Sequence, residues 1–404
     1  MTDRRQSSRP LDGYRIIEPA TMIAGPFCSS ILAEFGAEVI KVELPGQGDP
    51  LRSFGTMTET ESTLNWLNEG RNKKSITLDL HRKEGIDLFK RLVEKSDVVV
   101  ENFRPGTMEK WGLGYEDLKS INEAIILIRI SAYGQSGPYS ARPGYARVAH
   151  GFGGLSYLAG ESGGTPVVPG STSLADYVSG LYGALGALLA IVEKQKSGGG
   201  QSVDIALYEG IFRMLDEMAP AYARDGLIRE RMGADTVNVT PHSHYRTRDG
   251  KWVAIACSSD RMFKRLAAAM GQDELATRER FATMRQRLEH REAINQIVGQ
   301  WVESLTRQEL MERCLPLDVP VGPLNSIEDI FNDEHIRARR NLVEMDTDTG
   351  GSITVPNVIP RLSETPGRLD TLGPRLGAHN TEIYRGLLGL SSKELDTLKS
   401  SGII

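Results

Sequence analysis

Short runs of β-branched residues alternate with helix-like segments over the first 131 residues. The β-branched runs occupy residues 14–20, 38–43, 75–80, 97–103 and 124–131. The intervening segments include PFCSSILAEFG, RKEGIDLFKRLVEKS and GYEDLKSI, which have helical spacing or length. Strands that alternate with helices are joined by right-handed crossovers and build a mostly parallel sheet. The pattern therefore predicts a Rossmann-like α/β domain.

The sequence changes character after residue 131. Residues 132–170 are rich in glycine, proline and serine, and predict long loops of the kind that carry sites. KSGGGQSVDIAL predicts a further strand, and a helical pattern follows from 208 to about 224. A hairpin should turn at Asp249-Gly250, and the mixed segment from 260 to 320 indicates a second, smaller α+β unit. The tail predicts two short amphipathic helices, the second capped by Ser391.

Composition narrows the classes of protein that remain. With 404 residues, 40% of them hydrophobic and 25% charged, the chain can bury a large core. A net charge of −5 argues against general nucleic-acid binding. Three distant cysteines, Cys28, Cys257 and Cys314, fit a reducing compartment. The polar N-terminus shows no signal peptide, and the longest apolar run, 184–192, is too short to span a bilayer. We therefore expect a cytoplasmic protein that is not bound to a membrane.

Three common chemistries find little support. Glu43 ends a strand where dinucleotide-binding folds place a ribose-binding acid, but the first strand runs into ATMIAGP rather than G-x-G-x-x-G. His242 and His244 alternate, yet no third metal ligand lies nearby, so we expect no metal site. No G-x-S-x-G elbow is present for a serine nucleophile.

A carboxylate begins an otherwise apolar helix. In GSTSLADYVSGLYGALGALLAI, residues 170–191, apolar positions recur at three- and four-residue steps. Gly180 and Gly183 form a second stripe that starts at Asp176 and lets another backbone approach. Two interpretations stay open. Asp176 could complete a capping box with Ser173, or the helix dipole could hold it ionised as a nucleophile.

Two basic clusters flank predicted strands. Just before one strand lie Arg71, Lys73 and Lys74. Just after another lie Asn102, Phe103, Arg104 and Lys110. Ligands of open α/β sheets sit outside the carboxyl ends of the strands. Cations beside an aromatic ring would suit a nucleotide with phosphates.

Several stretches, in order from residue 10 to about 396, resemble the class III CoA-transferases of the CaiB/BaiF type, such as formyl-CoA transferase. They include NEGRNKKSITLDL, DVVVENFRPGTMEKWGLGYEDL, RPGY, LADYVSGLYGALGALLA and GGGQSVDIALYEG. The resemblance implies an interlocked, ring-like homodimer whose large domain is built from both chain ends. It also implies a large Rossmann-like domain over 1–224, a small α+β domain with linkers over 225–330, and a segment, 331–404, that returns to the large domain.

The resemblance further implies that Asp176 is the catalytic aspartate. It would attack an acyl-CoA and pass through an aspartyl anhydride and an aspartyl-CoA thioester before CoA moves to a carboxylic acid acceptor. CoA is then a substrate, and no cofactor is bound permanently. The implied CoA contacts are Met22, Ile23, Arg71, Lys73, Lys74, Asn102, Phe103, Arg104 and Lys110.

Departures from the family pattern bear on the substrate. Ile23 replaces the glutamine of formyl-CoA transferase, which argues against oxalate or formate. Arg147 and His150 add cations next to Tyr145, and a charge-assisted pair there could hold a second carboxylate. The expected reaction therefore moves CoA from succinyl-CoA to a small dicarboxylate. An α-methylacyl-CoA racemase, whose histidine would fall near Tyr145, and a non-catalytic CoA-binding protein remain alternatives.

Overall fold

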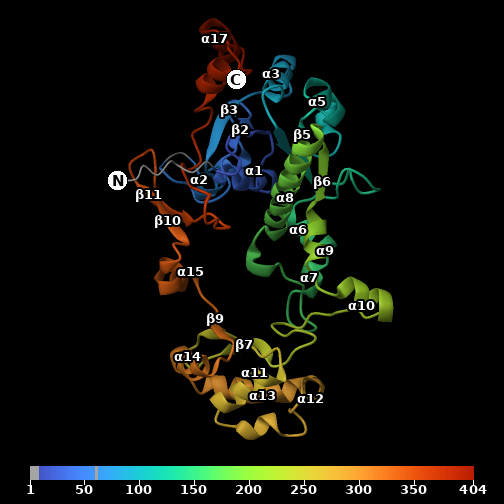
Figure 1. The fold of residues 1–404 in the computed structure, drawn as a ribbon, viewed down its shortest axis with the longest axis vertical. Helices are drawn as coiled ribbons and strands as arrows, with labels where there is room; N and C mark the ends of the chain where they lie inside the picture. The colour runs from blue at the N-terminus through green and yellow to red at the C-terminus, as the bar shows by residue number, and fades with distance from the viewer. Residues whose placement is uncertain (1–8, 60–61) are drawn as a thin grey trace. The chain divides into compact units, whose positions relative to one another are not determined.

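The computed structural model describes residues 9–59 and 62–404. It divides into two compact units. The large unit comprises Met1–Ser156, Val168–Leu227 and Arg339–Ile404, and the small unit comprises Tyr157–Val167 and Ile228–Ala338. Figure 1 shows the course of the chain through both.

A six-stranded parallel sheet forms the centre of the large unit, in the order β3-β2-β1-β4-β5-β6. The strands are β1 (Arg15–Glu18), β2 (Glu38–Glu43), β3 (Lys73–Thr77), β4 (Val98–Glu101), β5 (Ile126–Ser131) and β6 (Ser202–Ala206). The expected Rossmann-like parallel sheet is thus confirmed. The chain runs outward from β1 to β3 and then returns to add β4 on the other side of β1, so the strand order reverses between β1 and β4.

The helices of the large unit include α1 (Ala24–Glu34), α2 (Leu64–Glu69), α3 (Lys83–Val93), α4 (Thr107–Lys110), α5 (Tyr115–Ile121), α6 (Ala146–Phe152), α8 (Leu174–Ser197), α9 (Leu207–Arg213), α10 (Met218–Asp225) and α17 (Ser392–Ser400). Of these, α1 and α8 cover one face of the sheet, and α3 and α5 cover the other. A short helix, α7 (Leu155–Leu158), contains the first boundary between the units. The hairpin of β10 (Leu342–Asp346) and β11 (Ser352–Pro356) completes the large unit.

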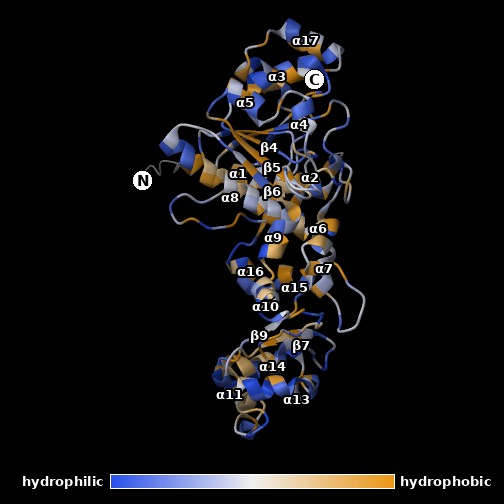
Figure 2. Ribbon diagram, turned by 90° about the vertical axis from the view of Figure 1, so that its right-hand side faces the viewer, coloured by the Kyte–Doolittle hydropathy of each residue, from blue (hydrophilic) through white to orange (hydrophobic). Residues whose placement is uncertain are grey.

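Alternation along each strand divides the core into two apolar layers. Val98 and Val100 of β4 pack with residues of α1 and α8, whereas Val99 packs with α3, α5 and the C-terminal residues. This is the period-two pattern of a sheet covered on both faces. Figure 2 shows the resulting hydrophobic colour of the central strands.

The helix α8 packs beside α1 and against the strands β5 and β6. Within the described residues it is the one helix whose length and composition would let it cross a membrane. Its small residues Gly183, Ala187 and Ala190 are buried in the core of the large unit. That burial is typical of a helix that covers a sheet.

The structure also corrects one predicted element. The helical pattern from 208 to 224 is two helices, α9 and α10, because the chain is interrupted at Asp216, whose φ is 49°. In the tail a π-helical segment, Glu382–Leu387, precedes α17, and the predicted cap is confirmed, since the Ser391 hydroxyl accepts the N–H of Glu394.

The small unit has its own antiparallel sheet. The strands β7 (His242–Arg246), β8 (Trp252–Ala256) and β9 (Val321–Pro323) pair in that order. The hairpin between β7 and β8 turns at Asp249 and Gly250, as predicted. The helices are α11 (Asp260–Ala269), α12 (Met284–Glu289), α13 (Arg291–Glu303), α14 (Arg307–Cys314), α15 (Ile327–Asn332) and α16 (Glu334–Ala338).

Candidate active site

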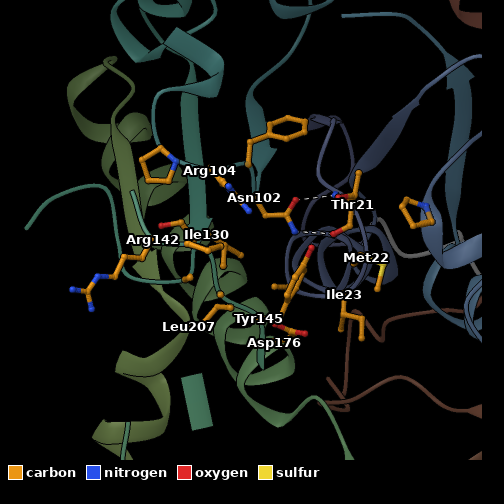
Figure 3. A pocket seen from close by; sticks show the side chains of 18 residues that line it. Thr21, Met22, Ile23, Asn102, Arg104, Ile130, Arg142, Tyr145, Asp176 and Leu207 are labelled. Carbon is orange, nitrogen blue, oxygen red and sulfur yellow. Dashed lines mark hydrogen bonds between the residues drawn. The ribbon is translucent and has the colours of Figure 1, made fainter. Parts of the chain in front are cut away.

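A cavity of about 400 Å³ opens at the carboxyl ends of β1, β4 and β5. Its walls come from the loops that follow these strands and include Met22, Ile23, Phe103, Arg104 and Asp176 (Figure 3). This is the edge of the sheet at which the strand order reverses. Open α/β sheets bind their ligands at such a switch point.

Asp176 faces this cavity from the first turn of α8. The capping-box interpretation is wrong, because the side chain of Ser173 makes no capping hydrogen bond. The backbone N–H of Asp176 donates to the carbonyl of Ser173 at 2.9 Å. Among the described residues, no side chain or backbone group hydrogen-bonds the Asp176 carboxylate. Burial raises the pKa of Asp176 to about 6. The group is therefore ionised at neutral pH, partly desolvated and free to react.

His150 supplies the missing helix cap. Its Nε2 accepts the N–H of Ala175 at 2.9 Å, and its side chain is fully buried. An accepting nitrogen carries no proton, and burial, together with the charge of Arg147, lowers the pKa of His150. His150 is therefore a neutral acceptor here rather than the expected substrate-binding cation, and it does not line the cavity.

The loop that follows β1 is held by a polar clamp. The Asn102 side chain accepts the Thr21 N–H at 2.8 Å and donates to the Thr21 carbonyl at 2.7 Å (Figure 3). Asn102 lines the cavity, but both polar atoms of its side-chain amide bond to the backbone of Thr21. Met22 has a left-handed φ of 64°, and its N–H donates to Asp49 at 3.1 Å. Met22 and Ile23 are presented to the cavity as expected.

Behind this loop lies a buried ion pair. Asp49 and Lys41 are 2.7 Å apart, and both side chains are fully inaccessible to solvent. Burial opposes ionisation of Asp49, but the charge of Lys41 and hydrogen bonds from backbone N–H groups hold its pKa below the usual range. Lys41 also pairs with the buried Glu18 at 3.1 Å, so Asp49 belongs to a small network of buried charges that compensate one another. Its hydrogen bond from the Met22 N–H ties the left-handed conformation of Met22 to this network.

The basic residues divide between cavity and surface. Arg104, one of the predicted CoA contacts, lines the cavity and is exposed. Arg142 also lines it and stacks 3.5 Å over the ring of Tyr139. Reasoning from charge clusters missed Arg142, although it stands in the RPGY motif. Arg147 is exposed on α6 and Lys110 is exposed on α4, and neither lines the cavity.

The cluster of Arg71, Lys73 and Lys74 is not brought to the cavity. These residues lie at the amino end of β3, whereas the cavity is at the carboxyl edge. Each cation is within 2.8 Å of a carboxylate: Arg71 of Glu34, Lys73 of Glu18, and Lys74 of both Glu38 and Glu382. These contacts satisfy the charges within the protein, so the predicted CoA contacts at these three positions are not supported.

A second cavity of about 400 Å³ adjoins the first. The two share Thr21, Pro50 and Phe103. Trp111 lines the second cavity and packs edge-on against Phe103, with ring centroids 5.1 Å apart. Glu43, at its wall, is buried and pairs with Arg52 at 2.7 Å, so it is neither a ribose ligand nor a solvated strand end. Together the cavities could take a long ligand with an aromatic end.

Tyr145 is the remaining predicted substrate contact. It lines the first cavity and is 74% exposed. A phenol is a much poorer general base than an imidazole. Within the described part of the chain, no histidine lines this cavity. Among the described residues the site therefore offers one carboxylate, flanking cations and no histidine as a second base.

Fold and site together define an α/β protein with a ligand cavity at the switch point and a reactive carboxylate facing it. The sequence pattern of CoA-transferase family III matches residues 11–380, and the chain belongs to this family.

Relatives agree with that assignment. The chain is 54% identical to the succinyl-CoA–L-malate CoA-transferase alpha subunit of Chloroflexus aurantiacus, over 99% of this chain and 94% of that protein. It is 51% identical to the beta subunit from the same organism, over 100% of both chains. A CaiB/BaiF family protein from Brucella suis superposes with a TM-score of 0.83 at 34% identity, covering 94% of this chain and 100% of that one.

Proposed function

We propose that this CoA-transferase moves CoA from succinyl-CoA to a four- or five-carbon dicarboxylate, with Asp176 as the nucleophile. The observation that carries the proposal is the unpaired, partly buried Asp176 carboxylate in the cavity at the switch point. The names of the Chloroflexus aurantiacus relatives support succinyl-CoA as donor and a dicarboxylate as acceptor.

The first half of the reaction loads CoA onto the enzyme. The Asp176 carboxylate attacks the thioester carbonyl, the C–S bond breaks, and CoA leaves as a thiolate. The thiolate then attacks the Asp176 carbonyl of the resulting anhydride and releases the donor acid as a carboxylate. The enzyme is left as an aspartyl-CoA thioester, so one difficult exchange is divided into easier steps.

The second half reverses these steps with the acceptor. The acceptor carboxylate attacks the Asp176 carbonyl and expels the CoA thiolate, which gives a new mixed anhydride. The thiolate then attacks the acyl carbon of the acceptor and frees the Asp176 carboxylate. Partial desolvation strengthens the carboxylate as a nucleophile in both halves, and its pKa of about 6 keeps it ionised at neutral pH.

CoA is proposed to lie along the two adjoining cavities. Its thioester would sit at Asp176, its pantetheine arm against Met22 and Ile23, and its nucleotide near Phe103 and Trp111. Arg104 is available for the phosphates. Lys110, on the neighbouring α4, is proposed as a second phosphate contact from the solvent side.

Recognition of the second carboxylate is assigned to Arg142 and Tyr145. Both line the cavity, whereas Arg147 does not. Because donor and acceptor take turns at Asp176, one cation would serve the distal carboxylate of each. A charge-assisted hydrogen bond is the interaction that separates dicarboxylates from monocarboxylates.

An acceptor panel tests the proposal. Wild-type, R142Q and R147Q enzymes are incubated with succinyl-CoA and either dicarboxylates or monocarboxylates, and the acyl-CoA products are identified by mass spectrometry. Wild type and R147Q should prefer dicarboxylates, and R142Q should lose most of that preference. Equal use of monocarboxylates by wild type would overturn the dicarboxylate assignment, and an unaltered R142Q would overturn the role of Arg142.

A racemase is the nearest alternative and has less support. Two-base exchange at the α-carbon needs a second base, and the cavity presents Tyr145 at the expected position. Incubation of an acyl-CoA in heavy water without an acceptor separates the two. α-Deuteration at the rate of turnover would favour the racemase, and its absence together with acceptor-dependent exchange would favour the transferase.

A homodimer is proposed as the assembled form. The α8 side chains Leu181, Leu185, Leu188, Leu189 and Val192 are each at least 40% exposed. Contiguous apolar surface of this kind marks an interface. Since the relatives are named as alpha and beta subunits, native mass spectrometry of this chain alone is the test. A monomer would contradict the homodimer.

A further inference from the structure

The start of α8 is capped from outside its own segment. The first turn of a helix leaves backbone N–H groups without intrahelical partners, and a side chain at the N-cap normally takes one of them. Ser173 occupies the N-cap of α8 but makes no such bond. The N–H of Ala175 is accepted instead by Nε2 of His150, which belongs to α6.

The imidazole is held in one protonation state. Because Nε2 accepts, the ring proton of the neutral histidine is on Nδ1. That Nδ1 is buried without a hydrogen-bond partner in the described structure. A second proton would remove the acceptor and place a charge in a buried site that already feels the charge of Arg147. The contact with Ala175 is therefore the polar interaction that orients the ring.

Asp176 immediately follows the residue that His150 caps. A carboxylate in the first turn of a helix is itself a good acceptor for free N–H groups at that end. If the Ala175 N–H lost its acceptor on His150, the Asp176 carboxylate, one residue further along, would compete with the Ser173 hydroxyl for it. Turning onto its own helix would take the carboxylate out of the cavity and stabilise its ionised, less nucleophilic form.

We propose that His150 is a positioning residue for Asp176: as a neutral acceptor it occupies the Ala175 N–H and so leaves the Asp176 carboxylate free in the cavity. The proposal rests on the proposed role of Asp176 as nucleophile. It assigns to a fully buried histidine, with no access to substrate, an effect on the chemical step rather than on substrate binding.

Two substitutions of His150 distinguish the effect of its hydrogen-bond acceptor from the effect of the volume of its ring. H150L keeps apolar volume and removes the acceptor, whereas H150Q keeps a neutral acceptor oxygen. His379 offers a matched control, because its Nδ1 also accepts a backbone N–H, that of Ser75 at 3.1 Å, but on the edge strand β3 and outside both cavities. H379L therefore loses the same kind of bond away from the cavity.

Steady-state kinetics with succinyl-CoA give the first readout. H150L should lower kcat by about tenfold or more through misplacement of the nucleophile, with KM changed less than about twofold. H150Q should recover to within about threefold of wild type, and H379L should keep wild-type kcat. A wild-type kcat in H150L, or a folded H150Q that is as impaired as H150L, would overturn the proposal.

The pKa of Asp176, measured by carbon-13 NMR of its carboxyl group, gives a readout independent of turnover. It should fall in H150L and stay near its wild-type value in H150Q. If H150L does not fold, H150M, with a weak acceptor only, takes its place. An unchanged pKa in the variant without a good acceptor contradicts the positioning role even if Asp176 is the nucleophile. Full activity of D176N would instead remove the proposed function.

Discussion

Replacing Gly180 by alanine tests whether the close approach of α1 and α8 builds the site. A Cβ at this position would lie 2.7 Å from the carbonyl oxygen of Ala24 and 3.2 Å from the N atom of Cys28. Both atoms belong to the backbone of α1, which cannot move aside locally. Ordinary contacts are longer by roughly 0.5 Å or more, so the two helices must separate by a similar amount.

Separating α1 from α8 would change the geometry of the active site. Ala24 lines the cavity, and Asp176 stands one helical turn before Gly180. Overpacking of this kind costs about 1–3 kcal/mol of unfolding free energy. A displacement approaching 1 Å between nucleophile and substrate lowers kcat/KM by roughly ten- to a hundredfold. Urea unfolding and steady-state kinetics measure the two effects.

Gly186 supplies the control within the same helix. A Cβ there would meet the side chain of Val203, at 2.8 Å, and no backbone atom. G186A should therefore keep near-wild-type kcat/KM, since any adjustment stays far from the cavity. If G180A were as active as G186A, the helix–helix contact would not position Asp176.

Three further predictions concern the cavity wall. Because the pKa of Asp176 is about 6, about 90% of its carboxyl groups are protonated and unreactive at pH 5. We therefore expect kcat/KM to increase with pH with an apparent pKa of about 6. An apparent pKa near 4 in the pH–rate profile would contradict a burial-raised pKa for Asp176. D49N removes one of the two buried carboxylates that pair with Lys41 and weakens the acceptor of the Met22 N–H, so urea unfolding should show a loss of roughly 1–3 kcal/mol; wild-type stability would show that Asp49 does not support the loop. R104Q should raise KM for succinyl-CoA by about fivefold or more, whereas K74Q, at the opposite edge, should not; equal effects would refute the assignment of CoA to the carboxyl edge.

The parallel sheet could be predicted because its signals are local. The run EVIKVE predicts β2 over the residues it occupies, Glu38–Glu43. Alternating apolar strands and amphipathic helices leave few topologies, so the carboxyl edge, and with it Asn102 to Arg104, could be placed at a ligand site. The close approach of another helix to the glycines of α8 could also be predicted, since α1 packs against Gly180 and Gly183.

Contacts between distant segments could not be predicted in the same way. Ser173 and Asp176 have the spacing of a capping box, but His150, on another helix, takes the N–H that Ser173 would have served. Arg71 and Lys73 form a basic cluster in sequence, yet buried acids from other elements, Glu34 and Glu18, pair with them. Both residues lie at or just before the start of β3, whereas ligands of open α/β sheets bind beyond the carboxyl ends of the strands.

The covalent state of Asp176 tests the central claim most directly. The enzyme is mixed with succinyl-CoA in the absence of acceptor, quenched in acid and digested, and the peptide that contains residue 176 is examined by mass spectrometry. The account predicts a CoA thioester on Asp176 that disappears when acceptor is added, and neither adduct nor turnover in D176N. Turnover without any adduct on this side chain, or a fully active D176N enzyme, would contradict it.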